Sequence, residues 1–269
     1  MKFYSLAVAI TLCLQLPAQK NASISFEKWI SLKNVGSPII SPDGRTIVYS
    51  VTSTDWANNS YDTELWMSRD REDPLQLTRT NKGSSIDAGF TPDSKFVSFL
   101  ADRGDKNQIY IISVNGGEAM QVTKDEDGID NYEWSPDGTK ILYAKSEAES
   151  KQDKNTKERF GAFGVVGEEY KQTHLWLLNF SYDSILLAGQ TPCYTAKKDS
   201  ANVDSVARDK KQECYTLPAA HTFTTGNFTV TGFAWSPDGK KVLINYQSNP
   251  LINSSITSDI AVVDVATKK

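Results

Sequence analysis

The sequence predicts an all-β protein, a partial β-propeller in which four-stranded antiparallel blades form an incomplete ring. Two observations lead to this fold class: one turn motif occurs four times, and similar strand patterns follow each copy. The copies are SPDGRTIVY (41–49), TPDSKFVSF (91–99), SPDGTKILY (135–143) and SPDGKKVLI (236–244), and their starts lie 50, 44 and 101 residues apart. Strand-only repeats of a few tens of residues are typical of solenoids and propellers.

The residue types of the motif are those that a tight turn requires. Ser or Thr occupies the first position, Pro presets φ at the second, Asp suits the third, and Gly ends the turn without steric penalty. An aromatic residue precedes three copies, namely Phe90, Trp134 and Trp235. Each motif therefore joins the end of one strand to the start of another.

Further strands are predicted between the turns. One set is ELWMS (64–68), QIYIISV (108–114), HLWLLNF (174–180) and DIAVVDV (259–265). In the first two units a third segment ends in Leu-Thr or Val-Thr, PLQLT (74–78) and NGGEAMQVT (115–123), and the latter contains an Asn-Gly-Gly hairpin signal. Four short strands per unit match one propeller blade. A β-sandwich is the alternative, but its turns need not repeat in sequence, so the propeller is favoured.

Composition excludes several classes of protein. The chain is 39% hydrophobic and 10% aromatic, which is enough to build a core. Its formal net charge is −4 with acidic and basic residues interspersed, so no nucleic-acid partner is expected.

The N-terminus is predicted to be a signal peptide over residues 1–18. Lys2 precedes an apolar run over 6–16 that is too short to span a bilayer and fits a secretory signal. Cleavage after Ala18 would leave 19–269 as the incomplete propeller. No other long apolar run occurs, so the mature chain is expected to have no membrane span and to be periplasmic or extracellular.

Export affects the interpretation of the cysteines. Cys13 lies in the signal, which leaves Cys193 and Cys214 in an irregular polar stretch. In an oxidising compartment they are a candidate disulfide, worth about 3 kcal/mol in the chain-entropy model. Two unpaired thiols are the alternative.

Regularity breaks at about 146–222, which is predicted to be a blade insertion. Residues 146–157 have i,i+4 charge pairs that favour a short solvated helix or loop. The glycine-rich and aromatic piece RFGAFGVVGEEY that follows carries two adjacent carboxylates, Glu168 and Glu169. A second stretch, roughly 181–222, is predicted to be a surface loop.

No catalytic residue, metal site or cofactor site is predicted. The sequence has no G-x-S-x-G nucleophile elbow and no glycine-rich phosphate loop. Its two histidines, His174 and His221, are expected to be structural or exposed, and no Cys/His spacing resembles a metal site.

The units, the region ERFGAFGVVGEEYKQTHLWLLN (158–179) and the segment 227–269 resemble the N-terminal propeller of secreted prolyl oligopeptidase-family serine peptidases, most closely the acylaminoacyl-peptidase and dipeptidyl-peptidase branch. TolB-type propellers share the turn motif. In the peptidase family the propeller admits short peptides to a C-terminal α/β-hydrolase domain that carries the Ser-Asp-His triad. The resemblance implies that this chain, ending at Lys269, lacks the catalytic domain and is inactive by itself.

The resemblance also implies a substrate site. Glu168 and Glu169 would hold the free amino group of a peptide, since carboxylates form strong charge-assisted hydrogen bonds with ammonium groups. Arg159 would contact a substrate carbonyl, and the complete enzyme could form a homodimer. The alternative function is a TolB-like periplasmic propeller that binds protein partners without catalysis.

Overall fold

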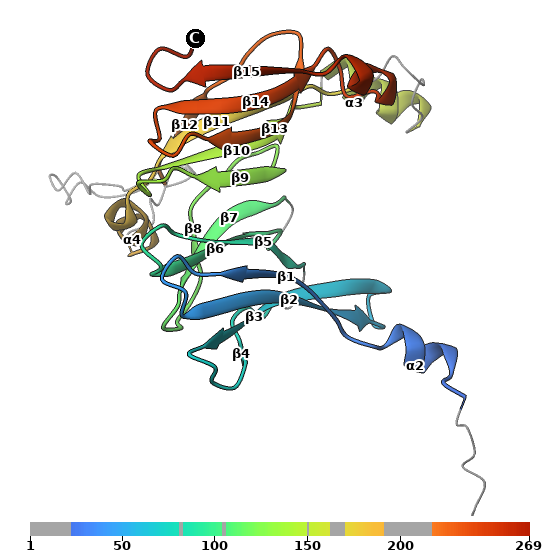
Figure 1. Cartoon of the computed structure of the whole chain (residues 1–269). Coiled ribbons are helices and arrows are strands. Elements are labelled where there is room, and N and C mark those ends of the chain that lie inside the picture. The colour runs from blue at the N-terminus through green and yellow to red at the C-terminus, as the bar shows by residue number, and fades with distance from the viewer. Residues whose placement is uncertain (1–22, 81–82, 104–105, 150, 162–169, 191–216) are drawn as a thin grey trace, which may run out of the picture.

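The computed structural model describes residues 23–80, 83–103, 106–149, 151–161, 170–190 and 217–269. Antiparallel β-sheets follow one another along the chain and stack face to face, with the first and last sheets at opposite ends of the stack (Figure 1). The predicted all-β fold, an incomplete ring of propeller blades, is confirmed. No helix in these ranges is long and apolar enough to cross a membrane.

Each sheet is a meander in chain order. Sheet 1 contains β1 (Asn34–Ile40), β2 (Thr46–Asp55), β3 (Ser60–Arg69) and β4 (Leu75–Gln76). Sheet 2 contains β5 (Ser85–Phe90), β6 (Phe96–Ala101), β7 (Gln108–Ser113) and β8 (Met120–Gln121). Sheet 3 contains β9 (Asn131–Trp134), β10 (Lys140–Ser146), β11 (Thr173–Asn179) and β12 (Ala220–Thr222). Sheet 4 contains β13 (Thr229–Trp235), β14 (Lys241–Gln247) and β15 (Asp259–Asp264).

The repeated motif forms the turn between the first and second strands of every sheet, with the same hydrogen bonds each time. In sheet 3 the Ser135 hydroxyl donates to Asp137 Oδ1 (2.6 Å), and the Thr139 N–H donates to the same oxygen (3.0 Å). Gly138 has φ +69°, a left-handed conformation that glycine adopts without penalty. The motif is therefore a self-contained local structure.

The hydrophobic core lies between the sheets in three clusters, because side chains alternate between the two faces of each strand. In β10, Ile141 and Tyr143 pack towards sheet 2, whereas Leu142 and Ala144 pack towards sheet 4. Every inner sheet is thus apolar on both faces.

A threonine closes the outer edge of the first three sheets. The backbone N–H groups of Leu65, Ile109 and Leu175 donate to the hydroxyls of Thr78, Thr123 and Thr224, each at 2.9 Å. This contact explains the Leu-Thr and Val-Thr endings of the sequence repeats. The third copy, Phe223-Thr224, was not predicted because it follows the long insertion.

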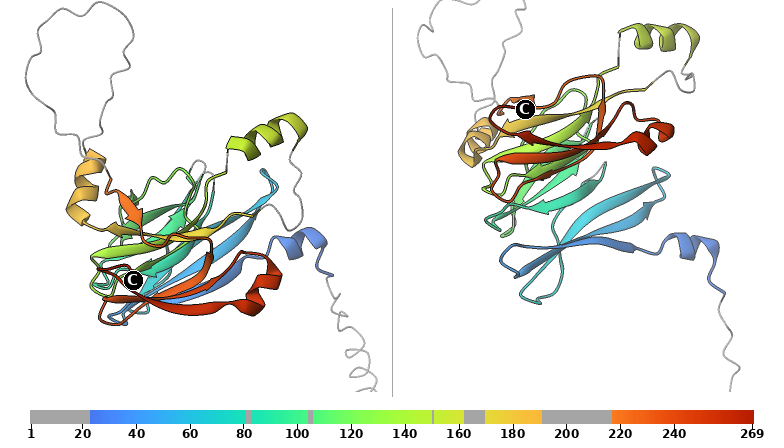
Figure 2. Two further views of the ribbon diagram at one scale, coloured as in Figure 1. Left: turned by 90° about the horizontal axis from the view of Figure 1, so that it is seen from above. Right: turned by 45° about the horizontal axis from the view of Figure 1, so that its top comes forward.

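In the described ranges three short α-helices accompany the sheets, two of them within 146–222, and a 3-10 helix, η1 (Ile252–Thr257), precedes β15. α2 (Phe26–Ile30) precedes β1, and α3 (Lys151–Phe160) agrees in part with the helix or loop predicted over 146–157. α3 and α4 (Tyr182–Gln190) lie at opposite ends of the strands (Figure 2).

The prediction of a surface loop over 181–222 is wrong at α4 and at β12, which pairs with β11. Ile185 is only 2% exposed in the core between sheets 2 and 3, and the Tyr182 ring lies 4.9 Å from that of Phe96. These apolar contacts stabilise a helix that the polar composition of the surrounding stretch conceals.

Candidate functional site

The described ranges contain one of the predicted site residues. Arg159 is exposed in the last turn of α3, and its guanidinium lies 5.8 Å from the ring centre of Phe160. Glu168, Glu169, Cys193 and Cys214 lie outside the described residues. Their predicted roles as an amino-group site and a disulfide therefore stay predictions.

The structure instead brings together residues from the first strands of three successive sheets. Here β5, β9 and β13 border a recess of about 620 Å³. Its lining consists of Asp87, Ala88, Gly89, Phe90, Asn131, Tyr132, Glu133, Trp134, Ala234 and Trp235. Because one edge strand from each sheet contributes, this recess faces the axis around which the sheets are stacked. We call it the inner-strand recess.

Irregular backbone places Asp87 in the recess. The register of β5 against β6 shifts between Ile86 and Gly89, and Asp87 has φ +50° with an exposed side chain. The Tyr132 hydroxyl lies 3.0 Å from the Asp87 carbonyl oxygen and 2.9 Å from Ser98 Oγ. The Tyr132 hydroxyl thereby fixes the β-bulge around Asp87 to sheet 3.

The aromatic side chains Phe90, Trp134 and Trp235 form what we call the aromatic wall of the recess, and the buried Ser98 anchors Trp134. Its hydroxyl is inaccessible to solvent, and it accepts the indole N–H of Trp134 at 2.8 Å. Phe180 packs edge-on against Trp134, with ring centres 4.6 Å apart. These contacts fix the position of the Trp134 side chain, which also lines the recess.

Glu133 is the second carboxylate of the recess. Burial raises its pKa, and a hydrogen bond from the backbone of Trp235 partly offsets this effect. Glu133 is therefore at a position where ionisation is opposed by desolvation.

Comparison of the four turns shows how unusual Glu133 is. Two positions before the hydroxyl residue of the motif, the units carry Ile39, Gly89, Glu133 and Ala234. Three sheets fold without a charge at this position, so the fold does not require one. Aligning the turns would have revealed this signal in the sequence, but not that Asp87 lies in the same recess.

The recess is electrostatically unbalanced. None of its lining residues is Lys or Arg, and within the described part of the chain neither Asp87 nor Glu133 takes part in an ion pair. Carboxylates that line one recess without a cation partner favour binding of a positive group. The described residues hold no set of three His, Cys, Asp or Glu side chains that could bind a metal ion.

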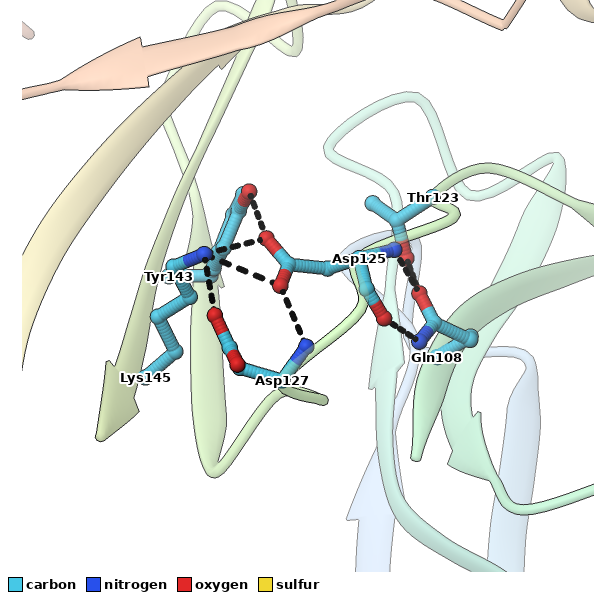
Figure 3. Close-up of polar contacts among 6 residues, drawn as sticks. All are labelled: Gln108, Thr123, Asp125, Asp127, Tyr143 and Lys145. Atoms are coloured by element: carbon cyan, nitrogen blue, oxygen red, sulfur yellow. Dashed lines mark hydrogen bonds and ion pairs between the residues drawn. The ribbon is translucent and has the colours of Figure 1, made fainter. Parts of the chain in front are cut away.

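A second polar cluster lies at the strand ends where α3 is inserted, and in it one lysine contacts two carboxylates (Figure 3). Lys145 Nζ lies 2.9 Å from both carboxylate oxygens of Asp125 and 3.3 Å from Asp127 Oδ2. Lys145 and Asp125 are 13% and 12% exposed. Gln108 Nε2 donates to the Asp125 carbonyl oxygen at 2.7 Å, and the Asp125 N–H donates to Gln108 Oε1 at 2.8 Å. This cluster fixes the link between sheets 2 and 3.

Beside this cluster is a pocket of about 430 Å³ that contains His174 and Trp176. Lys145 Nζ lies 4.2 Å from the Trp176 ring centre, and His174 Nδ1 lies 3.4 Å from Thr224 Oγ1. His174 is 12% exposed and packs against Phe228, whereas His221 is exposed in β12. His174 thus has the structural contacts expected from the sequence.

Comparison with known proteins relates these features to a family. Residues 18–163, just over half of the chain, match the family model described as TolB beta propeller domain. The chain is 30% identical over 162 residues to the uncharacterized peptidase YuxL of Bacillus subtilis, covering 58% of this chain and 25% of that protein. It is 22% identical over 259 residues to dipeptidyl-peptidase 5 of Porphyromonas endodontalis, covering 93% of this chain and 35% of that protein.

A solved structure shows the same fold. The acylaminoacyl peptidase of Pyrococcus horikoshii aligns with 87% of this chain and 31% of its own, with a TM-score of 0.53 and 12% sequence identity. The chain spans between a quarter and just over a third of the length of these proteins. The matches confirm the resemblance to peptidase propellers that the sequence predicts.

Proposed function

Because the chain belongs to the TolB β-propeller domain family, we propose that it is the substrate-gating propeller of an exported serine peptidase that acts on short peptides. The observation that carries the proposal is the inner-strand recess. A molecule that passes along the axis of the stacked sheets meets Asp87, Glu133 and the aromatic wall before it leaves the propeller.

The size of the recess supports a small ligand. Its volume of about 620 Å³ lies within the range of roughly 300–1,000 Å³ typical of small-molecule sites. Polar groups beside aromatic side chains are the usual composition of a site that fixes the orientation of its ligand. A few residues of an extended peptide fit this description, whereas a folded protein does not.

The chemistry of hydrolysis is assigned to residues outside this sequence. The chain has no nucleophile elbow. The aligned part makes up only 25% of YuxL and 35% of dipeptidyl-peptidase 5, both of which are named as peptidases. In this proposal the propeller selects the peptide, and an α/β-hydrolase domain supplies the Ser-Asp-His triad. Residues 1–18 direct export to the periplasm or the exterior.

The decisive experiment examines the native protein. Antibodies raised against residues 19–269 would be used to purify it from the source organism, and a fluorophosphonate probe would label any active serine. We expect a labelled band in the purified material, hydrolysis of short peptides and no hydrolysis of folded proteins. The recombinant 269-residue chain serves as the control and should not be labelled.

A binding module without catalysis is the second candidate, and the match to the TolB propeller model favours it. If the purified native material contains no probe-reactive serine but a stoichiometric partner protein, this second function replaces the first. Gel electrophoresis of the probe-treated material distinguishes the two outcomes, because it shows both the labelled band and any partner protein.

Glu168 and Glu169 have a role of their own in the proposal. In the complete enzyme, the variant Glu168→Ala/Glu169→Ala should raise KM for dipeptide substrates with a free amino group. The same variant should leave KM for Nα-acetylated substrates unchanged. Equal KM values for wild type and variant with free-amine substrates would contradict an amino-group site in the insertion.

A further inference from the structure

We propose that the inner-strand recess binds the guanidinium group of an arginine side chain in a peptide. Two carboxylates, Asp87 and Glu133, reach this recess from different sheets, and none of the lining residues carries a positive charge. The proposal deepens the proposed function, since it names a substrate feature, but the site itself can be tested without any peptidase activity.

The need for a cation follows from the burial of Glu133, whereas Asp87 is an exposed carboxylate of the same recess. Glu133 is half-buried, and its environment opposes ionisation. Within the described residues neither acid is paired with Lys, Arg or His. By contrast, Asp125 at the strand ends is paired with Lys145 at 2.9 Å. A ligand cation would pair with the carboxylates of the recess as Lys145 pairs with Asp125.

The fold gives no structural reason for this charge. The other units carry Ile39, Gly89 and Ala234 at the position of Glu133, and all form equivalent first strands. The Glu133 carboxylate does receive a hydrogen bond from the backbone of Trp235. One such bond leaves other acceptor positions of the carboxylate free, because a carboxylate has about four lone-pair sites.

The aromatic wall favours guanidinium over other cations. Guanidinium is planar, stacks on aromatic rings, pairs with carboxylates through two parallel hydrogen bonds, and is weakly hydrated. Trp134, Trp235 and Phe90 line the recess beside the carboxylates. A lysine ammonium or a free α-amino group is compact and strongly hydrated, so it gains less from this surface. A divalent metal would need more oxygen ligands than two carboxylates provide.

The test measures binding to the full chain by isothermal titration and by tryptophan fluorescence, since Trp134 and Trp235 line the recess. The probe is Nα-acetyl-arginine amide, which has the guanidinium but no free α-amino group. Nα-acetyl-citrulline amide has nearly the same shape without the charge, and glycine amide presents an α-amino group alone. We expect saturable binding of the arginine probe and no detectable binding of the other two.

Variants locate the site. Glu133→Gln retains an acceptor for the Trp235 backbone and should raise Kd for the arginine probe by about tenfold, the loss expected for one charge-assisted hydrogen bond. Asp87→Asn, at an exposed position, should also raise Kd without affecting folding. Glu118→Gln removes an exposed carboxylate in the loop between β7 and β8 and should leave Kd unchanged.

Several results would overturn the proposal. These are absence of saturable binding, equal binding of the citrulline probe, equal binding of glycine amide, or an unchanged Kd in Asp87→Asn. Far-UV circular dichroism shows whether Glu133→Gln is folded, and Asp87→Asn decides the question if it is not. Arginine binding by a protein without an associated peptidase would leave this inference standing while the proposed function failed.

Discussion

At the scale of single residues, the turn motif combines conformational and electrostatic constraints. The pKa values of Asp43, Asp137 and Asp238 are lowered, chiefly because the serine hydroxyl that opens each turn donates to the carboxylate. In the second turn Ser94 replaces glycine and still has φ +61°. Ser94 Oγ accepts the Asp43 N–H at 3.1 Å, so its hydroxyl makes a contact between turns that glycine cannot make.

Asp137 allows a prediction about pH. Hydrogen bonds from the Ser135 hydroxyl, the Thr139 N–H and the Thr139 hydroxyl lower its pKa to about 2 from 3.8. Because the folded pKa lies below the unfolded value, this stabilisation is present above pH 3.8 and is lost as pH falls towards 2. Urea unfolding of Asp137→Asn should show lower stability than wild type at pH 7, and the difference should shrink between pH 4 and pH 2.

An exposed acid provides the control for this prediction. Glu118→Gln removes an exposed carboxylate between β7 and β8, so it should change stability at pH 7 by less than about 0.5 kcal/mol. A difference for Asp137→Asn that is constant from pH 7 to pH 2 would contradict the account of the turn.

At the scale of secondary-structure elements, each sheet depends on contacts between strands far apart in sequence. β12 is separated from β11 by some forty residues, yet it occupies the same place as β4 and β8 in the first two sheets. The threonine that follows it closes the sheet edge in the same way. The pairing of strands is therefore independent of the length of the insertion.

Thr224 gives a matched test of this closure. Thr224→Val keeps the shape of the side chain but leaves the buried N–H of Leu175 without its acceptor, at a cost of about 1–3 kcal/mol in the free energy of unfolding. The adjacent Thr225 is exposed, so Thr225→Val should change stability by less than about 0.5 kcal/mol. Equal effects of the two variants in urea unfolding would refute a structural role for the hydroxyl.

The ion pair between Lys145 and Asp125 offers a test of the link between sheets 2 and 3. Lys145→Met retains the apolar stem but leaves the nearly buried Asp125 without its cation, which should cost about 2–3 kcal/mol. The double variant Lys145→Met/Asp125→Asn should recover part of this loss, because no unpaired charge is left. A double-mutant cycle measured by urea unfolding gives the coupling energy, and zero coupling would show that the pair does not stabilise the link.

At the scale of the whole molecule, the two end sheets differ from the inner ones. The strand register aligns Leu243, Ile260 and Val262 of sheet 4 with Leu142, Leu175 and Leu177 of sheet 3. The sheet 3 residues are at most 3% exposed beneath sheet 4, whereas Leu243, Ile260 and Val262 are 44%, 64% and 56% exposed. The outer face of sheet 4 thus matches the buried face of sheet 3 but is not covered by any other described residues, and an exposed apolar face favours association.

Substitution of this face should improve solubility without unfolding the chain. The triple variant Leu243→Thr/Ile260→Thr/Val262→Thr should show less self-association by light scattering, with an unfolding midpoint close to that of wild type. Leu142→Thr, at the equivalent buried position, should instead lose about 3 kcal/mol or more of stability. Unchanged light scattering by the triple variant would show that sheet 4 does not drive association.

Sequence and structure agree best where the structure is local. The turns, the second strands and the strands that carry alternating apolar residues could be predicted, because a tight turn and a strand each need particular residue types at fixed spacing. α4 could not be predicted, since Ile185 and Tyr182 stabilise it through contacts with sheet 2. The predicted roles of Glu168, Glu169, Cys193 and Cys214 were not tested, since those residues lie outside the described ranges.

The sequence by itself therefore determined the fold class, the repeat unit and the turn chemistry, all of which depend on residues close together in the chain. Only the tertiary structure decided which side chains share a site. Asp87 and Glu133 lie 46 positions apart, on first strands of different sheets, and no local pattern shows that both face one recess. The stacking of sheets through their apolar faces brings these edge strands together, so the recess is a property of packing rather than of any segment.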